Sequence, residues 1–428
     1  MEITSRFKDG KKTPGGSRDN TRQTQELRKP RSSAVGIRRN SRAGYTHARR
    51  AARSPTMLLS RRAAATLYPS LFAGLRRRVE LLSTQPLPVP NDEFGYPAIR
   101  FEFGKPSALP DAFALMAPIM QPIRDELPAL VTSEHKVLTD VAEHFFKKTG
   151  KSFRPTIVML AAAAANGGAE ANSSQQRLAQ IVEMIHVSSL MHDDVIDRSD
   201  TRRGAPAVHK VWGVKTAVMG GDFLLARATV LLARLGNNEV VKLMAQTIDE
   251  MVAGELMQAT ETSDSLLDFD HYLHKTYRKT AALICLSCES AAVLGGHTAE
   301  VQQALHSYGR HLGLAFQVVD DLLDLTASSD ALGKPAGADM AAGHATAPAL
   351  YALEEHPEME ELIRRKFKGE GDVAKALQLT TGSAALRRTA DLATSHAQKA
   401  AEAIGVLPPS AARDGLLRLC ADVINRNE

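Results

Sequence analysis

The body of the chain, from about residue 110 onward, has the hydrophobic pattern of helices. Apolar residues recur at intervals of three and four, Ala, Leu, Met, Gln, Glu and Lys dominate, and strictly alternating runs are absent. Glycine-rich breaks divide this pattern into helices of roughly 15 to 30 residues. The breaks fall at Gly150, residues 166–168, Gly204, residues 236–238 and residues 295–296. Long alanine-rich helices with isolated interior polar residues predict an all-α fold, a large single-domain helical bundle around a deep central cavity.

The first part of the chain has a different character. Residues 1–82 hold 20 of the 53 Lys and Arg residues but only 5 of the 48 Asp and Glu residues, so the remainder is net acidic. Residues 1–56 contain almost no large apolar side chains, and we expect them to form a disordered basic extension. A proline-rich stretch, residues 84–91, then leads into a folded domain that we expect to occupy residues 105–428.

The segment between the basic extension and the domain is typical of a targeting signal. Residues 57–78 are amphipathic, rich in Arg and free of acidic residues, as mitochondrial presequences are. We therefore interpret residues 57–90 as a mitochondrial presequence followed by the proline-rich linker, which predicts a mitochondrial protein. Because a presequence normally begins at the initiator methionine, Met57 is a second candidate for the start of translation. The alternative is a basic tail without targeting value.

Three other kinds of protein are disfavoured. Nucleic-acid binding would rest only on the basic leader, where aromatic residues are not spaced for base stacking, so no nucleic-acid partner is expected. The longest apolar run, residues 156–165, is about half of the roughly 18 to 20 residues that cross a bilayer, so no transmembrane segment is expected. Cys285 and Cys288 form a C-x-x-C without a second ligand pair, which favours core packing over zinc or redox chemistry.

The first of two aspartate clusters introduces the candidate chemistry. Asp193 and Asp197 are four residues apart and so lie on one face of a helix, with Asp194 about 100° around it. Three carboxylates within little more than one turn repel one another unless a cation compensates them. Mg²⁺ is the natural candidate, because it prefers carboxylate oxygens and completes its octahedron with water and phosphate oxygens. For one such cluster alone, a solvated acidic face is the alternative.

A second cluster, formed by Asp320, Asp321 and Asp324, repeats the spacing within strongly apolar sequence. A solvated face is hard to reconcile with these neighbours, so two such clusters predict an inward-facing site for magnesium and diphosphate. Basic residues suited to phosphate oxygens stand close to the first cluster. They are Lys151 and Arg154 before it and Arg202 and Arg203 after it.

With these motifs the chain resembles the trans-isoprenyl diphosphate synthases, in particular the long-chain polyprenyl diphosphate synthases that make the ubiquinone side chain. The resemblance covers residues 110–428 and includes both aspartate clusters. Its other markers are Gly150-Lys151-x-x-Arg154-Pro155, Glu183-Met184-Ile185-His186, Arg202-Arg203-Gly204, Gly221-Asp222 with Arg227, Lys279-Thr280, Gln317 ahead of the second cluster, and Gly333-Lys334-Pro335.

The resemblance implies a role for each matching residue. Asp193, Asp194 and Asp197 would bind Mg²⁺ and, through it, the allylic diphosphate. Asp320 and Asp324 would hold a further ion, with Asp321 in the same cluster. The residues implied for the allylic diphosphate are Arg202, Lys279, Gln317 and Lys334. Those implied for isopentenyl diphosphate are Lys151, Arg154, His186 and Arg203. Thr280 would lie beside the reacting centre.

The same resemblance implies a magnesium-dependent prenyl transfer. The allylic diphosphate ionises, the double bond of isopentenyl diphosphate attacks the allylic cation, and the departing pyrophosphate takes the proton, so no protein base is required. One departure from the family pattern is His344, where many members have lysine. With an unperturbed pKa of roughly 6.5, this histidine would be mostly neutral, which affects only a peripheral phosphate contact.

Product length in such enzymes is expected to depend on the residues that precede the first cluster on its helix. Short-chain members carry a large aromatic residue four or five positions before Asp193, whereas this chain has Ser188 and Ser189 there. An open tunnel is therefore expected, with a product of roughly thirty to fifty carbons, most simply eight to ten isoprene units.

Two rival functions and the state of assembly remain open from the sequence. The chain could be the catalytic or regulatory subunit of a heteromeric polyprenyl synthase, although it keeps both aspartate clusters. A terpene cyclase would need only one acidic cluster and no second diphosphate site. The expected partners are isopentenyl diphosphate and an allylic diphosphate, with a homodimer or heteromer as the active form and peripheral membrane contact for product release.

Overall fold

The computed structural model describes residues 109–146, 152–326 and 336–426. The predicted basic extension (residues 1–56), the predicted presequence and linker (residues 57–90), Lys151 and Lys334 lie outside the described residues. Within those residues the all-α prediction is confirmed, because the only strands are β1 (Thr201–Arg202) and β2 (Ala205–Pro206), which pair antiparallel. This small hairpin was not predicted.

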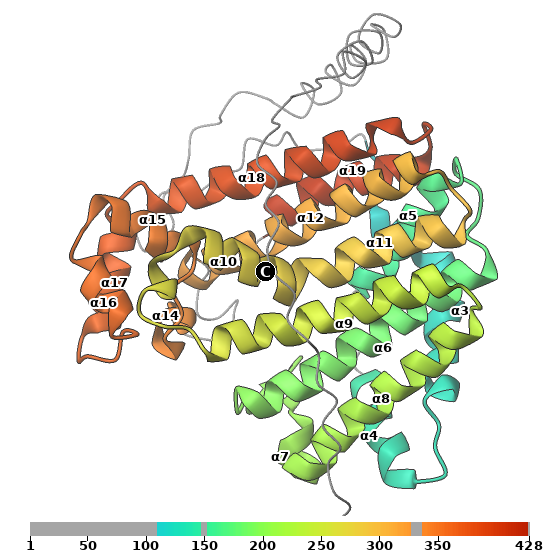
Figure 1. Cartoon of the computed structure of the whole chain (residues 1–428), viewed down its shortest axis with the longest axis horizontal. Helices are drawn as coiled ribbons and strands as arrows, with labels where there is room; N and C mark the ends of the chain where they lie inside the picture. The colour runs from blue at the N-terminus through green and yellow to red at the C-terminus, as the bar shows by residue number, and fades with distance from the viewer. Residues whose placement is uncertain (1–108, 147–151, 327–335, 427–428) are drawn as a thin grey trace, which may run out of the picture. The chain divides into compact units, whose positions relative to one another are not determined.

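The helices of the first half of the described chain make one layered bundle (Figure 1). They are α3 (Ala112–Leu130), α4 (Lys136–Phe146), α5 (Phe153–Ala165), α6 (Ser173–Ile196), α7 (Val208–Trp212), α8 (Val214–Arg234) and α9 (Asn238–Ala259). The breaks predicted at residues 166–168 and 236–238 follow α5 and α8, and Gly204 lies in the β1–β2 turn.

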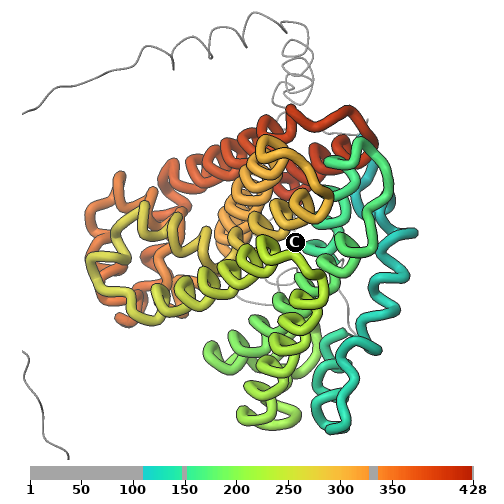
Figure 2. Tube along the Cα trace, turned by 45° about the vertical axis from the view of Figure 1, so that its right-hand side comes forward, coloured from blue at the N-terminus to red at the C-terminus, as the bar shows by residue number. Residues whose placement is uncertain are grey.

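The second half adds further helices to this bundle and a group of shorter ones beside it. The elements are η2 (Ser265–Leu267), α10 (Phe269–Thr276), η3 (Tyr277–Ala281), α11 (Ala282–Leu294), α12 (Ala299–Thr326), α14 (Ala338–Ala342), α15 (Ala347–Glu355), α16 (Met359–Arg364), α17 (Asp372–Thr381), α18 (Ala385–Ala403), η4 (Ile404–Val406) and α19 (Ala411–Ile424). Figures 1 and 2 both show α11 lying between α9 and α12.

The core sits where the sequence is most uniformly apolar. Every residue of α5 from Pro155 to Ala165 is buried, so this alanine-rich helix has no solvent face. It packs against α6, α11 and α19. A second, smaller apolar cluster, which includes Tyr272, Leu322 and Met340, joins α10 and the end of α12 to the short helices that follow. The second aspartate cluster therefore lies where the two cores meet.

Glycines without room for a side chain bring three elements unusually close. A Cβ at Gly313 of α12 would lie 2.6 Å from the Cα of Ala281, and a Cβ at Gly254 of α9 would lie 2.8 Å from the backbone nitrogen of Lys279. Such distances are too short for any side chain, so glycine is required for this approach. As a result η3 is held between α9 and α12.

Among the described residues one helix, α8, is long and apolar enough to cross a membrane by length and composition alone. It packs along α6 and, like a bundle helix, buries one face through Ala217, Leu224 and Ala228. The core helix of a soluble protein passes the same test, so this finding is weak evidence for a membrane span. The absence of a transmembrane segment stays a prediction.

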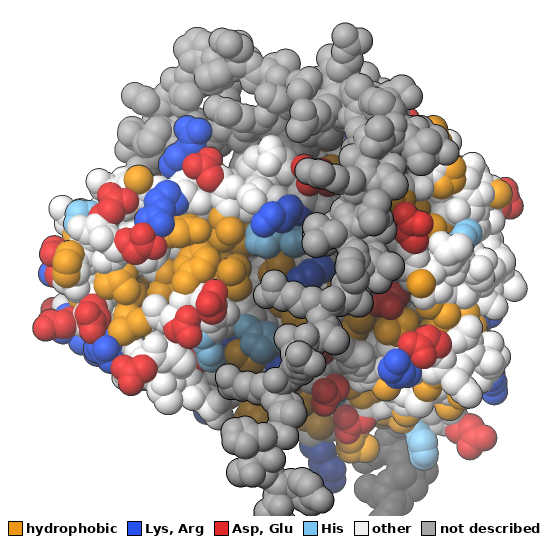
Figure 3. Space-filling view, turned by 45° about the horizontal axis from the view of Figure 1, so that its top comes forward, with side chains coloured by type: hydrophobic (Ala, Val, Ile, Leu, Met, Phe, Trp, Pro, Cys, Tyr) orange, Lys and Arg blue, Asp and Glu red, His pale blue; other side chains and the backbone are white. Residues whose placement is uncertain are grey.

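The face of the molecule drawn in Figure 3 carries basic and acidic side chains interspersed around apolar ones. Nucleic-acid-binding surfaces instead gather Lys and Arg into one basic patch or stripe. The basic side chains visible on this face are not gathered in that way, and the expectation of no nucleic-acid partner stays a prediction.

Candidate active site

The first aspartate cluster lies at the C-terminal end of α6. The N-terminus of this helix is fixed by a capping box, in which Asn172 and Gln175 each accept the other's backbone N–H. Asp193 and Asp194 occupy its last turn, and Asp197 is its C-cap. Because the C-terminal end of a helix carries partial negative charge, three carboxylates here are disfavoured unless cations compensate them. The location itself therefore indicates a cation-binding end.

The members of this cluster have different surroundings. Burial, followed by the nearby Glu255 carboxylate, raises the pKa of Asp193 to about 7. Asp194 is almost fully buried, and its Oδ1 accepts from Arg202 through Nε at 2.8 Å and Nη2 at 2.5 Å. Its Oδ2 is buried without a hydrogen-bond partner among the described residues. A buried carboxylate oxygen without a hydrogen-bond donor is suited to binding a cation.

The second cluster lies in the last two turns of α12, again at a C-terminal end. Asp320 is paired with Arg426, whose guanidinium also donates to the carbonyl of Phe316 and stacks over its ring. Asp324 Oδ2 accepts the backbone N–H of Asp339 at 3.2 Å. Burial raises the pKa of Asp320, although Arg426 opposes the shift.

The middle residue of this cluster, Asp321, is held inside the protein. It is 3% exposed and accepts from Tyr272 Oη at 2.6 Å and from Gln317 Nε2 at 2.9 Å. Burial, followed by the charge of Asp339, raises the pKa of Asp321 to about 7. Its side-chain contacts thus differ from those of Asp320 and Asp324, and its exclusion from the metal ligands stays a prediction.

No three His, Cys, Asp or Glu side chains among the described residues form a ready-made metal cage. Mg²⁺ does not need one, because it usually keeps several waters and is shared between one or two carboxylates and substrate phosphates. The donor chemistry of the two clusters, together with the unpaired Oδ2 of Asp194, fits a magnesium ion that is completed by a diphosphate.

Lys279 and Thr280 lie on η3, a π-helical segment. Such segments are rare and are found frequently at functional sites. Lys279 Nζ contacts Glu255 Oε1 at 2.7 Å and donates to Gln258 Oε1 at 3.2 Å, while Thr280 donates to Gln317 Oε1 at 2.9 Å. The close approaches at Gly254 and Gly313 thus join residues of α9, η3 and α12.

A second basic group gathers between the start of α5 and the middle of α6. Arg154 Nη1 donates to Nε2 of His186 at 3.0 Å, and its Nε is buried without a partner among the described residues. Burial, followed by the neighbouring Arg154 charge, lowers the pKa of His186 well below its usual range. His186 is therefore neutral beside a cation. Glu183, whose pKa is raised by burial, faces Arg203 and Arg154.

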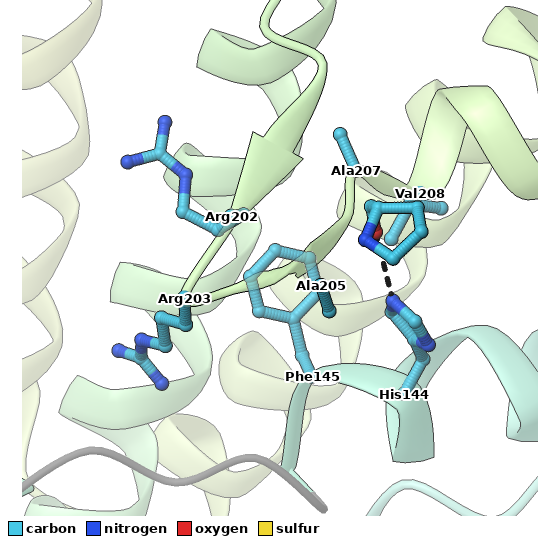
Figure 4. Close-up of a pocket in the computed structure, with 8 residues that line it drawn as sticks. His144, Phe145, Arg202, Arg203, Ala205, Ala207 and Val208 are labelled. Carbon is cyan, nitrogen blue, oxygen red and sulfur yellow. Dashed lines mark hydrogen bonds between the residues drawn. The ribbon is translucent and has the colours of Figure 1, made fainter. Parts of the chain in front are cut away.

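The β1–β2 hairpin presents the arginine pair. Arg203 and Gly204 have φ angles of 52° and 70°, the left-handed values that a two-residue type I′ turn requires. Figure 4 shows both guanidinium groups extending to the same side, away from His144 and Val208. His144 Nε2 lies 3.1 Å from the Pro206 carbonyl oxygen and ties α4 to the hairpin. The two-residue turn thus places the guanidinium groups of Arg202 and Arg203 on the same side of the hairpin.

The two serines predicted to leave the tunnel open have small side chains turned to backbone carbonyls. Ser188 is buried and donates to the carbonyl of Gly221 on α8 at 2.8 Å. Ser189 donates within its own helix to His186 O at 2.9 Å. Ser188 therefore lies at the contact between α6 and α8.

Sequence reasoning missed four residues that touch the predicted site residues. Glu255 and Gln258 contact Lys279, Tyr272 contacts Asp321, and Arg426 contacts Asp320. The glycine at 254 was the one available signal, because it marks a place where a helix admits close backbone approach. His344, the departure from the family pattern, lies 3.5 Å from Gln258, and burial lowers its pKa.

Comparisons with a family model and with known relatives indicate one family. Residues 135–380 match the family model of the polyprenyl synthetases. A prenyl transferase of Synechocystis is 44% identical over 73% of this chain and 98% of its own length. The mitochondrial solanesyl-diphosphate synthase 1 of Oryza sativa is 43% identical over 74% of this chain and 78% of its own length.

A solved structure supports the same assignment. The crystal structure of a polyprenyl synthase from Caulobacter crescentus, complexed with calcium and isoprenyl diphosphate, is 34% identical with a TM-score of 0.68, covering 74% of this chain and 97% of that one. The similarity covers 78 to 98% of the length of these relatives. The chain therefore belongs to the polyprenyl synthetase family.

Proposed function

We propose that this chain is a magnesium-dependent prenyltransferase that elongates an allylic diphosphate with successive isopentenyl diphosphate units. The product is an all-trans polyprenyl diphosphate of about eight to ten units, on the logic that cavity depth measures the ligand, and serves the ubiquinone side chain. The observation that carries this proposal is the pair of aspartate clusters, each at the C-terminal end of a long helix. Family membership supports it.

In this proposal the acidic residues of the site bind the metal and the basic residues bind the two diphosphates. Mg²⁺ would be held by Asp193, Asp194 and Asp197 and by Asp320 and Asp324. When bound, the metal supplies charge neutralisation to the leaving diphosphate. The chain's own cations for that diphosphate are Arg202, Lys279 and Lys334, joined by the amide of Gln317. Its cations for isopentenyl diphosphate are Lys151, Arg154 and Arg203, with neutral His186 as a hydrogen-bonding group.

The reaction is tested by incubating the protein with Mg²⁺, farnesyl diphosphate and labelled isopentenyl diphosphate, then sizing the product after its phosphates are removed. We expect a ladder that ends at about forty to fifty carbons. If the purified chain incorporates no label alone but does so with a partner, the chain is one subunit of a heteromer. Failure under both conditions contradicts the proposal.

The predicted tunnel has its own test in the replacement Ser188→Phe. A phenyl ring at a buried position against α8 should close the tunnel near the first cluster, so the product should shorten by several isoprene units. Ser199→Phe, on the loop after α6, is a control outside this contact. An unchanged product in Ser188→Phe would place the end of the tunnel elsewhere.

We further propose that the protein is mitochondrial and that its active form is a homodimer or a heteromer. Support for the location comes from the basic leader and from relatives such as the mitochondrial rice enzyme. Support for assembly comes from exposed apolar side chains on α8, including Val218, Met219 and Val230. Reporter fusions of residues 1–90 and 57–90 test the location, with diffuse cytosolic signal from both as the contrary result. Light scattering on the purified protein tests the assembly.

A further inference from the structure

Tyr272 of α10 lies outside both aspartate clusters, yet its hydroxyl group contacts one of them. Its side chain is 3% exposed, and its ring packs against Phe269 in the smaller apolar cluster. The hydroxyl donates to Asp321 Oδ2 at 2.6 Å. A hydrogen bond this short between two buried groups fixes the position of the Asp321 carboxyl group.

This contact begins a chain of three hydrogen bonds. Gln317 Nε2 donates to Asp321 Oδ1 at 2.9 Å, and Thr280 Oγ1 donates to Gln317 Oε1 at 2.9 Å. The chain connects α10, α12 and the π-helical segment η3. It runs from the smaller apolar cluster to the residue beside Lys279.

The contacts of Asp321 determine which group donates and which accepts in each of these hydrogen bonds. Both carboxyl oxygens of Asp321 accept, Oδ2 from Tyr272 and Oδ1 from the amide nitrogen of Gln317, so this nitrogen faces Asp321. The amide oxygen of Gln317 then faces Thr280, whose hydroxyl must donate its only hydrogen there. Thr280 therefore has only lone pairs left to offer a substrate.

We propose that Tyr272 is a positioning residue of the active site, which acts through Asp321 and Gln317 to fix Thr280 as a hydrogen-bond acceptor. The inference rests on the proposed function, in which positive charge develops on the allylic carbon. A fixed lone pair stabilises such charge without reorganising during the reaction. The orientation of Thr280 thus contributes to the rate of the chemical step more than to substrate binding.

The replacement Tyr272→Phe removes the first bond and leaves the ring in place. In the full-length protein with Mg²⁺, farnesyl diphosphate and labelled isopentenyl diphosphate, we expect kcat to fall by about tenfold to a hundredfold, as when a hydrogen-bond partner that orients an active-site group is lost. The KM of each substrate should stay within about twofold, because the charged groups are untouched. Tyr351→Phe, in the same apolar cluster, is the matched control and should leave kcat unchanged.

Two further measurements separate positioning from support of the fold. The rise in Tm caused by Mg²⁺ with inorganic pyrophosphate should be the same in wild type and Tyr272→Phe, because binding is retained. In a double-mutant cycle with Asp321→Asn, the two losses in kcat should be strongly non-additive, since both replacements act through the same series of hydrogen bonds. Additive losses, or equal effects on kcat and KM, would overturn the inference.

A wild-type rate in Tyr272→Phe overturns the positioning role and leaves the proposed function intact. An inactive wild-type chain overturns both. Should Tyr272→Phe fail to fold, Asp321→Asn alone decides, because it changes the acceptor of the same hydrogen bond. The role then requires a loss in kcat with little change in KM, and a wild-type kcat rejects it.

Discussion

At the residue scale, three basic side chains of the site form ion pairs with carboxylates, and a bound substrate can take the place of a partner in each pair. Arg202 is paired with Asp194, Arg426 with Asp320, and Lys279 with Glu255. Each of these three cations thus already contacts a carboxylate. A diphosphate with its magnesium brings both signs of charge, so these pairs can exchange partners without leaving a buried charge alone.

Arg202→Lys tests whether the geometry of one pair matters in addition to its charge. Lysine keeps the charge but cannot reproduce the two bonds from Nε and Nη2 to Asp194. Losing one charge-assisted bond of about 1.5 kcal/mol corresponds to about a tenfold effect. We expect the KM for farnesyl diphosphate to rise by about that factor, with little change for isopentenyl diphosphate.

The matched control is Arg198→Lys, at an exposed position between α6 and β1. Its kinetics should equal those of wild type. If Arg202→Lys raised the KM of isopentenyl diphosphate instead, the assignment of the two diphosphates to their cations would be reversed.

At the element scale, the position of η3 depends on glycine at 254. Gly254→Ala would improve helix propensity in α9, but its Cβ would lie 2.8 Å from the Lys279 nitrogen. Overpacking of this kind costs about 1 to 3 kcal/mol and moves the backbone. We expect a lower Tm together with a fall in kcat, because Lys279 and Thr280 shift with η3.

The control for this variant is Ala245→Gly, at an exposed position of α9. It should cost about 1 kcal/mol of stability through helix propensity and leave kcat unchanged. Equal losses of kcat in the two variants would mean that stability, and not the position of η3, controls the rate.

The contact between α12 and α18 predicts a pH effect on stability. The Nδ1 atoms of His311 and His396 lie 2.9 Å apart, and burial lowers the pKa of both to about 4. Their folded pKa values lie below the unfolded value of about 6.5, so the unfolded chain binds more protons between these limits. Their contribution to stability is present above pH 6.5 and is lost as the pH falls toward 4.

Urea denaturation at pH 7 and pH 5 measures this contribution. The free energy of unfolding should fall more in wild type than in His396→Gln, by on the order of 1 kcal/mol. His135→Gln, which removes an exposed histidine between α3 and α4, should behave as wild type. Identical losses in wild type and His396→Gln would contradict the effect.

At the scale of the whole molecule, the sequence predicted what depends on local spacing. The aspartates four residues apart, the helix breaks at glycines and the arginine pair were all readable along the chain. The contacts of Glu255, Tyr272 and Arg426 were not, because each joins elements distant in sequence. Which residues they contact depends on how closely α9, η3 and α12 pack and on the path of the chain after α19.

The central proposal is that the two aspartate clusters form one site for magnesium and diphosphate. The rate at which label from isopentenyl diphosphate is incorporated into prenyl product tests it. Wild type should be active with Mg²⁺ and inactive with a chelator. Asp193→Asn and Asp320→Asn should each lose about a hundredfold or more in rate while remaining folded. Asp391→Asn, exposed on α18, should keep the full rate. A wild-type rate in either cluster variant would contradict the assignment of both clusters to one site.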